Sequence, residues 1–146
     1  MFSGLRIANS GMSAERVAMD VTAQNIANAE TTRTTTGGAY QRRVAQLEAV
    51  LGAPPTAFGP TLSAMGFVGG VPSGGVRVAG IATDTSPGAM VYSPGHPDAD
   101  KSGYVRLPNI NLTEELLSFK ESTDSFQANS TVFQAISSML KKAVKI

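Results

Sequence analysis

Cysteine is absent from this sequence of 146 residues, and only one histidine is present. The lack of cysteine excludes disulfides, thiolate nucleophiles and thiolate metal sites, but it is compatible with reducing and oxidising compartments alike. The net charge of +1 gives no electrostatic reason to expect nucleic acid or an anionic membrane as a partner. No apolar run approaches the roughly 18 residues of a membrane span, so we expect no membrane insertion. Met1 to Ser10 lack the basic and apolar regions of a signal peptide, so we expect no cleaved signal.

Apolar residues repeat every seven positions near both ends of the sequence. The N-terminal series is Leu5, Met12, Met19 and Ile26, and the C-terminal series is Leu112, Phe119, Phe126, Phe133 and Leu140. A seven-residue repeat keeps one stripe of a helix facing a partner helix. The spacing predicts one helix from about Ser3 to Ala29 and a second from Asn111 onward. Together they predict a terminal coiled coil from which a smaller module projects.

The first predicted helix carries a second stripe, of mostly small residues, beside the heptad series. These residues are Gly4, Ile7, Gly11, Ala14, Ala18 and Val21. Small side chains allow another backbone to come close, and an apolar arc this wide needs neighbours on two sides. An ordinary helix bundle is the simpler interpretation, but the sequence contains only one other long helix. We therefore favour neighbours from other subunits.

The second predicted helix has clear signals at its start and in its seam. Asn111 and Glu114 stand three apart in an arrangement similar to a capping box. Acidic residues occupy the first half of the helix and lysines its end, which complements the helix dipole. Asn129 falls at a d position, three residues after Phe126. A polar residue in such a seam costs stability and tends to fix the register.

The middle of the sequence is built from turns and short strands. No residue between Glu48 and Arg77 is charged, and positions 52–75 contain seven glycines and four prolines, which excludes a helix there. Alternating patterns predict strands at Tyr40–Leu47, Val76–Ala82, Ala89–Tyr92 and Tyr104–Leu107. The expected fold class is α+β, with long N- and C-terminal helices forming a coiled-coil core and a small β-rich module inserted between them. The expected domains are terminal helices in 1–36 and 111–146, as a polymerisation core, and the β-rich module in 37–110, with a Gly/Pro-rich loop at about 51–75.

One stretch, Pro94 to Tyr104, imitates a metal site. Its Asp98, Asp100, Ser102 and Gly103 resemble the opening of an EF-hand loop, but Asn109 occupies the position of the closing glutamate and no helix precedes the loop. We favour a tight turn, in which proline and glycine set the dihedral angles and aspartates cap local amides. The residues of this structural turn are Pro94, Gly95, His96, Pro97, Asp98, Asp100 and Gly103. With one histidine, no nucleophile elbow and no phosphate-binding loop, we expect no enzyme, no metal and no cofactor.

Two smaller clusters have simple structural interpretations. The threonine-rich run from Thr31 to Thr36 is expected to end the first helix, because β-branched residues disfavour its continuation. Arg42 and Arg43 with Tyr40 have the composition of a nucleic-acid patch. In a nearly neutral chain they are more simply one polar face of a strand, so we expect no nucleic-acid partner.

Several stretches of the sequence resemble the flagellar rod and hook axial proteins. The run from Gln24 to Thr32, Gln-Asn-Ile-Ala-Asn-Ala-Glu-Thr-Thr, follows an amphipathic helix and is similar to a signature that these proteins share. A closer resemblance, to the proximal-rod members, rests on residues 37–43, 75–78, 84–87, 92–100, 103–111 and 125–129. Glu30 departs from the asparagine common in the family, Gly88 and Ala89 replace a bulkier pair, and residues 51–74 match nothing in it.

The resemblance implies a structural subunit of the bacterial flagellar basal body. Such subunits are exported unfolded through the flagellar type III apparatus and polymerise between the export-gate adaptor and the distal rod. The implied partners are copies of itself and other rod proteins, and the terminal helices pack into a tubular core. The assembly residues expected are Leu5, Met12, Met19, Asn25, Ile26, Asn28, Leu112, Phe119, Phe126, Asn129, Phe133 and Leu140. Two rival classes remain: a hydrolase or metal protein built on His96, Asp98 and Asp100, and a soluble coiled-coil adaptor. Another flagellar axial (rod or hook) component is a further alternative within the family.

The first prediction concerns the free subunit. The N-terminal helix has two apolar stripes and few partners within the chain, and isolated helices of this length are marginal in water. Both ends of the purified monomer are therefore expected to be largely unfolded and to become ordered on assembly. Hydrogen exchange measures this directly. Strong protection of the amides from Leu5 to Ile26 in the monomer contradicts the prediction.

Overall fold

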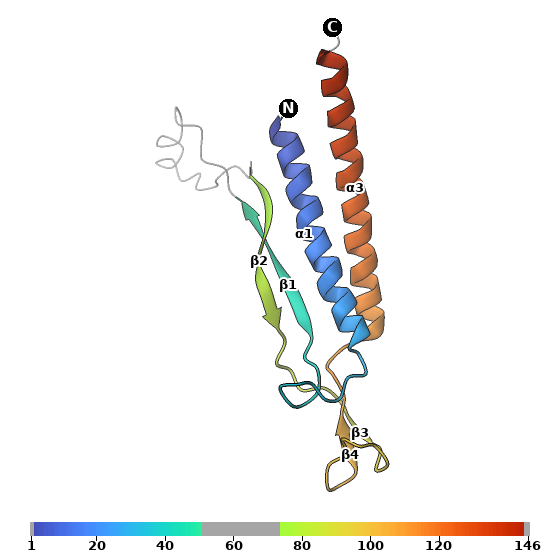
Figure 1. Ribbon diagram of the computed structural model, residues 1–146. Coiled ribbons are helices and arrows are strands. Elements are labelled where there is room, and N and C mark those ends of the chain that lie inside the picture. The colour runs from blue at the N-terminus through green and yellow to red at the C-terminus, as the bar shows by residue number, and fades with distance from the viewer. Residues whose placement is uncertain (1, 51–73, 145–146) are drawn as a thin grey trace, which may run out of the picture. The chain divides into compact units, whose positions relative to one another are not determined.

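Two long helices and four strands make up the described part of the chain (Figure 1). The computed structural model describes residues 2–50 and 74–144. The elements are α1 (Phe2–Ala27), β1 (Arg43–Val50), β2 (Gly75–Thr83), β3 (Met90–Tyr92), β4 (Tyr104–Arg106) and α3 (Leu112–Val144). This confirms the α+β class. The Gly/Pro-rich loop predicted at about 51–75 lies outside the described residues except for Gly74 and Gly75.

The signals that end α1 and begin α3 are visible in their hydrogen bonds. At the end of α1, the backbone N–H of Asn28 donates to the carbonyls of Gln24 and Asn25 before the chain leaves the helix. At the start of α3, Asn111 Oδ1 accepts from the Thr113 N–H at 3.1 Å, which confirms Asn111 as the N-cap. The capping box is incomplete, because Glu114 accepts from the Asn111 side chain, at 3.0 Å, and not from its backbone N–H.

The strands form two separate two-stranded sheets, β1–β2 and β3–β4. The β3–β4 pair is antiparallel, with Val91 opposite Val105 and Tyr92 opposite Tyr104. All four predicted strands are present, although β1 begins three residues later than the pattern indicated. Tyr40 and Arg42 are not part of the strand. They form hydrogen bonds with other segments of the chain, as described below.

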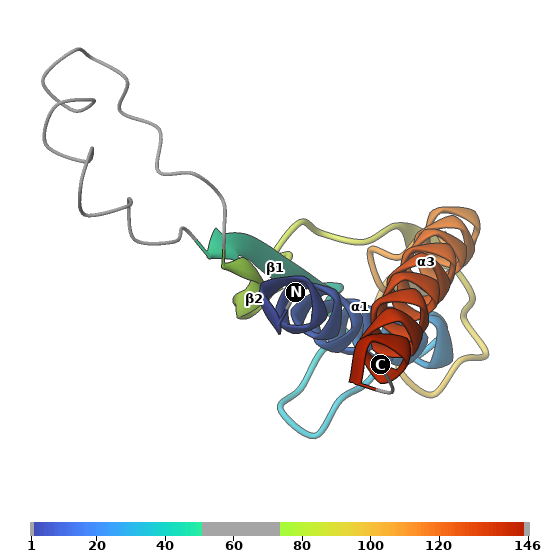
Figure 2. The same cartoon turned by 90° about the horizontal axis from the view of Figure 1, so that it is seen from above.

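The described residues fold as two compact units, and each unit contains part of both helices. In the first unit, which includes 2–16 and 124–144, Gly4 faces Ile136 and Gly11 faces Asn129. In the second unit, 17–46 and 80–123, Thr123 Oγ1 donates to Met19 Sδ at 3.5 Å. Within each unit, α1 and α3 therefore run side by side and antiparallel (Figure 2). At Gly4 and Gly11, the neighbour of the small-residue stripe is the chain's own α3 and not another subunit.

Few apolar side chains are buried in the described part of the chain. Among the described residues, the buried hydrophobic side chains are Ala8, Ala14, Val21 and Val105. Neither helix in this part of the chain combines the length and hydropathy that a membrane span requires. The scarcity of buried apolar groups gives particular weight to the polar contacts described below.

The two heptad series differ in burial. Leu5, Met12, Met19 and Ile26 are half-buried along α1. On α3, Leu112 and Phe119 are exposed, whereas Phe126, Phe133 and Leu140 are half-buried. A strict seven-residue repeat drifts by about 20° per heptad around a straight helix, so one series cannot face a single neighbour over its whole length. The coiled-coil core remains a prediction about the assembly.

Local hydrogen bonds hold the turn between β3 and β4. Asp100 Oδ1 accepts from the N–H groups of Ser102, at 2.8 Å, and Tyr104, at 2.9 Å. His96 Nδ1 accepts from the Asp98 N–H at 3.1 Å. Gly103 has φ +80°, a conformation that side chains disfavour. These bonds are the kind expected of a structural turn.

The second prediction uses this turn. A Cβ on Gly103 would lie 2.9 Å from Tyr92 Cε2, and the positive φ adds backbone strain. Gly103→Ala is therefore expected to lower the free energy of unfolding by about 1–3 kcal/mol. Gly95→Ala is the matched control, because a Cβ there meets no atom within 4 Å and φ is not positive. Urea unfolding of both variants tests the difference, and equal stabilities contradict it.

Candidate functional site

The buried stripe of α1 ends on a polar side chain. Ala14, Val21 and Asn25 are all buried and follow one another at helical spacing. Asn25 and Glu115 are the largest fully buried side chains in the described part of the chain, each only 1% exposed. Polar groups at such depth must be hydrogen-bonded, because an unpaired one costs about 1–3 kcal/mol.

The Asn25 amide is fully hydrogen-bonded. Its Nδ2 donates to the backbone carbonyl of Arg43 at 2.8 Å and to Glu115 Oε2 at 2.9 Å. Its Oδ1 accepts from the Arg43 N–H at 3.0 Å and from the Tyr40 hydroxyl at 3.1 Å. Because one amide engages both backbone groups of Arg43, Asn25 replaces a neighbouring strand at that residue.

The buried carboxylate of Glu115 is paired on both oxygens. Arg42 Nε donates to Oε1 at 2.5 Å, while Asn25 donates to Oε2. The Arg42 side chain is 30% exposed, so this ion pair joins a buried anion to a partly hydrated cation. Glu115 also lies in the first turn of α3, where the helix dipole favours a negative charge. Removing one partner of such a pair leaves the other charge buried without compensation, which is strongly destabilising.

Residues 40–43, where β1 begins, also form hydrogen bonds with residues 84 and 109 of the second unit. Arg42 donates its N–H to Asn109 Oδ1 at 3.1 Å, and its carbonyl accepts from the Asp84 N–H at 2.8 Å. The Arg43 guanidinium lies 5.9 Å from the centroid of the Tyr40 ring, within cation–π range. We call Asn25, Tyr40, Arg42, Arg43 and Glu115 the Asn25 network. It links α1, the 40–43 segment and the first turn of α3.

The sequence-derived assembly residues are not gathered at one place. Asn25 is the centre of the network, whereas Asn28 makes local contacts: it donates to the Gln24 carbonyl at 2.8 Å and accepts from Thr31 Oγ1 at 3.2 Å. Asn129 lies against Gly11 in the first unit. The turn residue Asp98 reaches back to the end of α1, where Thr32 Oγ1 donates to its Oδ2 at 2.8 Å.

The sequence alone did not identify Glu115, Arg43 and Tyr40 as partners of Asn25. Glu115 was interpreted only as a complement to the helix dipole, and the other two as the polar face of a strand. The available signal was that the stretches containing Asn25, Arg42 and Asn109 all carry the family resemblance. Their sequence separations gave no indication that they meet.

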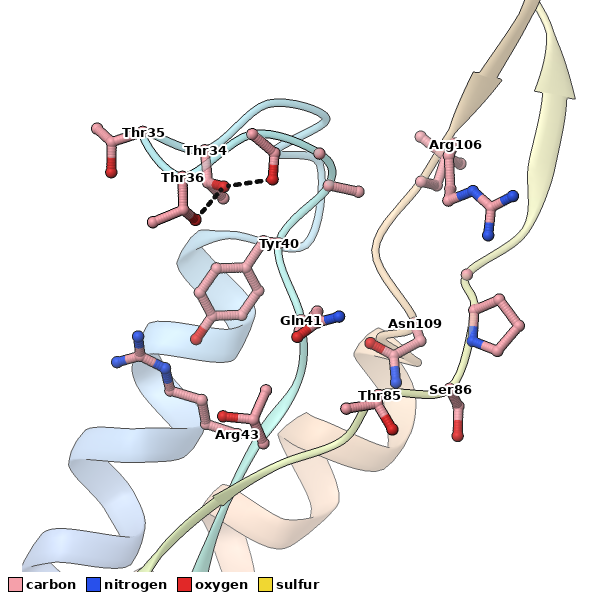
Figure 3. Close-up of a pocket in the computed structure, with 17 residues that line it drawn as sticks. Thr34, Thr35, Thr36, Tyr40, Gln41, Arg43, Thr85, Ser86, Arg106 and Asn109 are labelled. Atoms are coloured by element: carbon pink, nitrogen blue, oxygen red, sulfur yellow. Dashed lines mark hydrogen bonds between the residues drawn. The ribbon is translucent and has the colours of Figure 1, made fainter.

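An open groove of about 660 Å³ lies in the second unit beside the network (Figure 3). Residues 34–41 and 43 form one wall, and residues 83, 85–88, 106, 107 and 109 form the other. Its described lining is rich in hydroxyl and amide side chains, including those of Gln41 and Asn109, and contains no carboxylate. Among all residues that the structure describes, no group of three or more His, Cys, Asp or Glu residues is placed to hold a metal ion.

The Asp84–Pro87 stretch forms a short turn next to this groove. The Ser86 N–H donates to Asp84 Oδ1 at 2.9 Å, as in an Asx turn. Hydrogen bonds from the Ser86 side chain, and then from its backbone, lower the pKa of the Asp84 carboxyl below its ordinary value of 3.8. The Asp84 carboxylate is therefore charged at neutral pH. Separately, the Asp84 N–H donates to the Arg42 carbonyl.

The third prediction compares two asparagines that lie three residues apart at the end of α1. Asn25→Ala leaves the Arg43 N–H and carbonyl and one Glu115 oxygen without their partner, so unfolding free energy should fall by about 3 kcal/mol or more. Asn28→Ala removes only two local bonds, neither of them fully buried, and should cost about 1 kcal/mol or less. Urea unfolding of basal bodies assembled from each variant measures the contrast, because the ends of the free monomer are expected to be largely unfolded. Equal losses mean that the Asn25 network does not stabilise the fold.

Two family models match the ends of the chain. Residues 5–33 match the flagella basal body rod protein model, and residues 101–146 match the C-terminal model of the flagellar basal body rod FlgEFG proteins. The first match contains Asn25, and the second contains Glu115. The remaining members of the Asn25 network lie in neither match.

Relatives of the chain match it over nearly its full length. A flagellar basal-body rod protein FlgC from Borreliella burgdorferi is 38% identical, covering 100% of this chain and 97% of that protein. The FlgC protein of Bacillus subtilis is 34% identical, covering 99% of this chain and 97% of its own length. The FlgC protein of Salmonella typhimurium is 31% identical over 96% of this chain and 92% of its own. With its rod-protein ends and this full-length similarity, the chain belongs to the FlgC family of flagellar basal-body rod proteins.

Proposed function

We propose that this chain is a structural subunit of the flagellar basal-body rod, which polymerises through its terminal helices to build the proximal part of the drive shaft. The observation that carries the proposal is the similarity, over nearly the full length, to FlgC proteins of three bacteria. In this assignment, 1–36 and 111–146 form the polymerisation core, and 37–110 forms the β-rich module.

Exposed apolar side chains on α3 support a role in assembly. Leu112, Leu116 and Leu117 are each about half exposed, and Val132 and Met139 are exposed farther along the same helix. Single exposed apolar residues are ordinary, but a helix that carries this many on its surface is typical of an interaction surface. Neighbouring subunits would cover them.

The partners that fit this role are other copies of the chain, other proximal and distal rod proteins, and the export-gate adaptor at the base. The corresponding location is the periplasmic rod, reached through the flagellar type III system without a cleaved signal peptide. The proposed role requires no catalysis and no cofactor. The turn with His96, Asp98 and Asp100 serves as a structural element.

A soluble coiled-coil adaptor is the alternative. It would form a stable helical dimer when purified, whereas a rod subunit should remain monomeric until assembly. Asn129 offers a contact to a neighbouring subunit. Its half-buried amide faces Gly11 and makes no hydrogen bond within the described residues, so it is available to a neighbouring subunit.

The fourth prediction tests the function with two variants of the same seam. Phe126 is half-buried in the single chain and neighbouring subunits would bury it further, so Phe126→Ala should cost the assembled subunit about 3–5 kcal/mol. Rod growth should stop, because every subunit carries the defect. Asn129→Leu should instead leave association intact and relax the register that the amide enforces, giving irregular or aggregated assemblies.

A strain that lacks the chain, supplied with each variant, separates these roles. Motility, export and images of isolated basal bodies are the measurements, and the unaltered chain is the control. Rods that grow normally without the chain contradict the proposed function. Normal, motile rods from Asn129→Leu show that the amide does not set the register.

A further inference from the structure

The β3–β4 pair presents one bare face. Its antiparallel register places Met90, Tyr92, Tyr104 and Arg106 on the same side, since residues two apart share a face of a sheet. Tyr92 is 64% exposed, Met90 49% and Tyr104 43%. Val105, on the other side, is only 3% exposed. The protein thus covers part of one side of the pair and leaves the aromatic side uncovered.

The chain holds this face rigid. The two tyrosine rings pack edge to face with their centroids 5.2 Å apart. The Asp100 carboxylate fixes the Tyr104 backbone, and Gly103 allows the turn to lie against the Tyr92 ring. A rigid pair of tyrosines next to methionine and arginine has the composition of a binding hot spot, because little side-chain entropy is lost on contact.

The aromatic face also carries a cation. Arg106 is exposed and takes part in none of the ion pairs among residues 2–50 and 74–144. A partner that covers the tyrosines would therefore gain from presenting a carboxylate beside an apolar side chain.

The first half of α3, in the same compact unit, has that composition. Leu117 is 57% exposed and lies one turn from Glu114 on one side and from Glu121 on the other. Glu114 accepts from the Asn111 side chain, whereas Glu121 forms no ion pair within the described residues. Leu117 and Glu121 thus form an exposed apolar and acidic patch.

We propose that the β3–β4 face of one copy docks on the Leu117–Glu121 patch of the next copy, with the tyrosines against Leu117 and Arg106 paired with Glu121. The proposal rests on the proposed function, since it names one contact within the polymer. Two different, complementary patches on one chain form a heterologous contact, which propagates along a filament and does not close into a dimer. The turn from Pro94 to Gly103 then serves to build a docking face.

A charge exchange tests the ion pair in living cells that carry only the variant chain. Arg106→Glu places two carboxylates in contact, as Glu121→Arg does two cations, and each alone should reduce the number of basal bodies at least about tenfold. The double variant restores opposite charges and should restore assembly. Lys101→Glu is the matched control, because it makes the same charge change on an exposed turn residue outside the docking face.

Each outcome of this exchange is decisive for the ion pair. Normal assembly of either single variant overturns the pairing of Arg106 with Glu121. Failure of the double variant, when both single variants also fail, overturns it as well. Recovery in the double variant cannot be explained by a folding defect, because each substitution alone would carry that defect into it.

A cysteine pair tests the geometry independently. The chain has no cysteine of its own, so Tyr92→Cys with Leu117→Cys introduces the only two thiols. Oxidised basal bodies should then yield a reducible ladder of linked subunits, and each single-cysteine chain should yield none. A dimer from Tyr92→Cys alone indicates a symmetric contact, and links only to other rod proteins indicate a different occupant. Either result overturns the proposal, as does an incorporated double-cysteine chain that yields no ladder.

The proposed function and the docking contact would be contradicted by different results. If the unaltered chain is missing from isolated basal bodies, the proposed function itself is wrong. If the chain is present but gives no ladder and tolerates Arg106→Glu, only the docking contact is wrong. Should the double-cysteine chain fail to enter basal bodies, the charge exchange decides the docking contact.

Discussion

One buried amide organises the second unit of this protein. Asn25 holds both backbone groups of Arg43 and one oxygen of Glu115, and in return accepts the Tyr40 hydroxyl. All four of its hydrogen-bonding positions are used, so the amide can be buried without leaving an unpaired polar atom. The start of β1, the end of α1 and the first turn of α3 are therefore fixed by the same side chain. In a fold with few buried apolar groups, such a network supplies the specificity that a larger core would otherwise provide.

Local signals in the sequence were sufficient for the elements and their ends. Heptad spacing located both helices, Asn111 marked the N-cap of α3, and alternating residues located all four strands. The need for a positive φ at Gly103 could be suspected because glycine closes a turn there. Each of these features depends on residues within a few positions of one another, which is why a single sequence reveals them.

Features that depend on distant residues could not be predicted in the same way. Glu115 looks like an ordinary acidic residue of a first helical turn, and only the fold brings it to Asn25, 90 positions away. The exposure of Leu112 and Phe119 also escaped the heptad pattern, because periodicity states which residues share a stripe and not which neighbour covers it. Long-range pairing and partner identity are properties of the folded chain and of its assembly.

The tandem arginines at the start of β1 bear on the register in which residues 40–43 pack against α1 and α3. If the segment slid by one residue, Arg43 would take the place of Arg42 and could still neutralise Glu115. The charge therefore cannot distinguish the two alignments. Tyr40 can, because the slide would put Gln41 in its place, and that shorter side chain has no aromatic ring to offer an arginine. The Tyr40 ring therefore adds to the native alignment a contact that the ion pair alone does not provide.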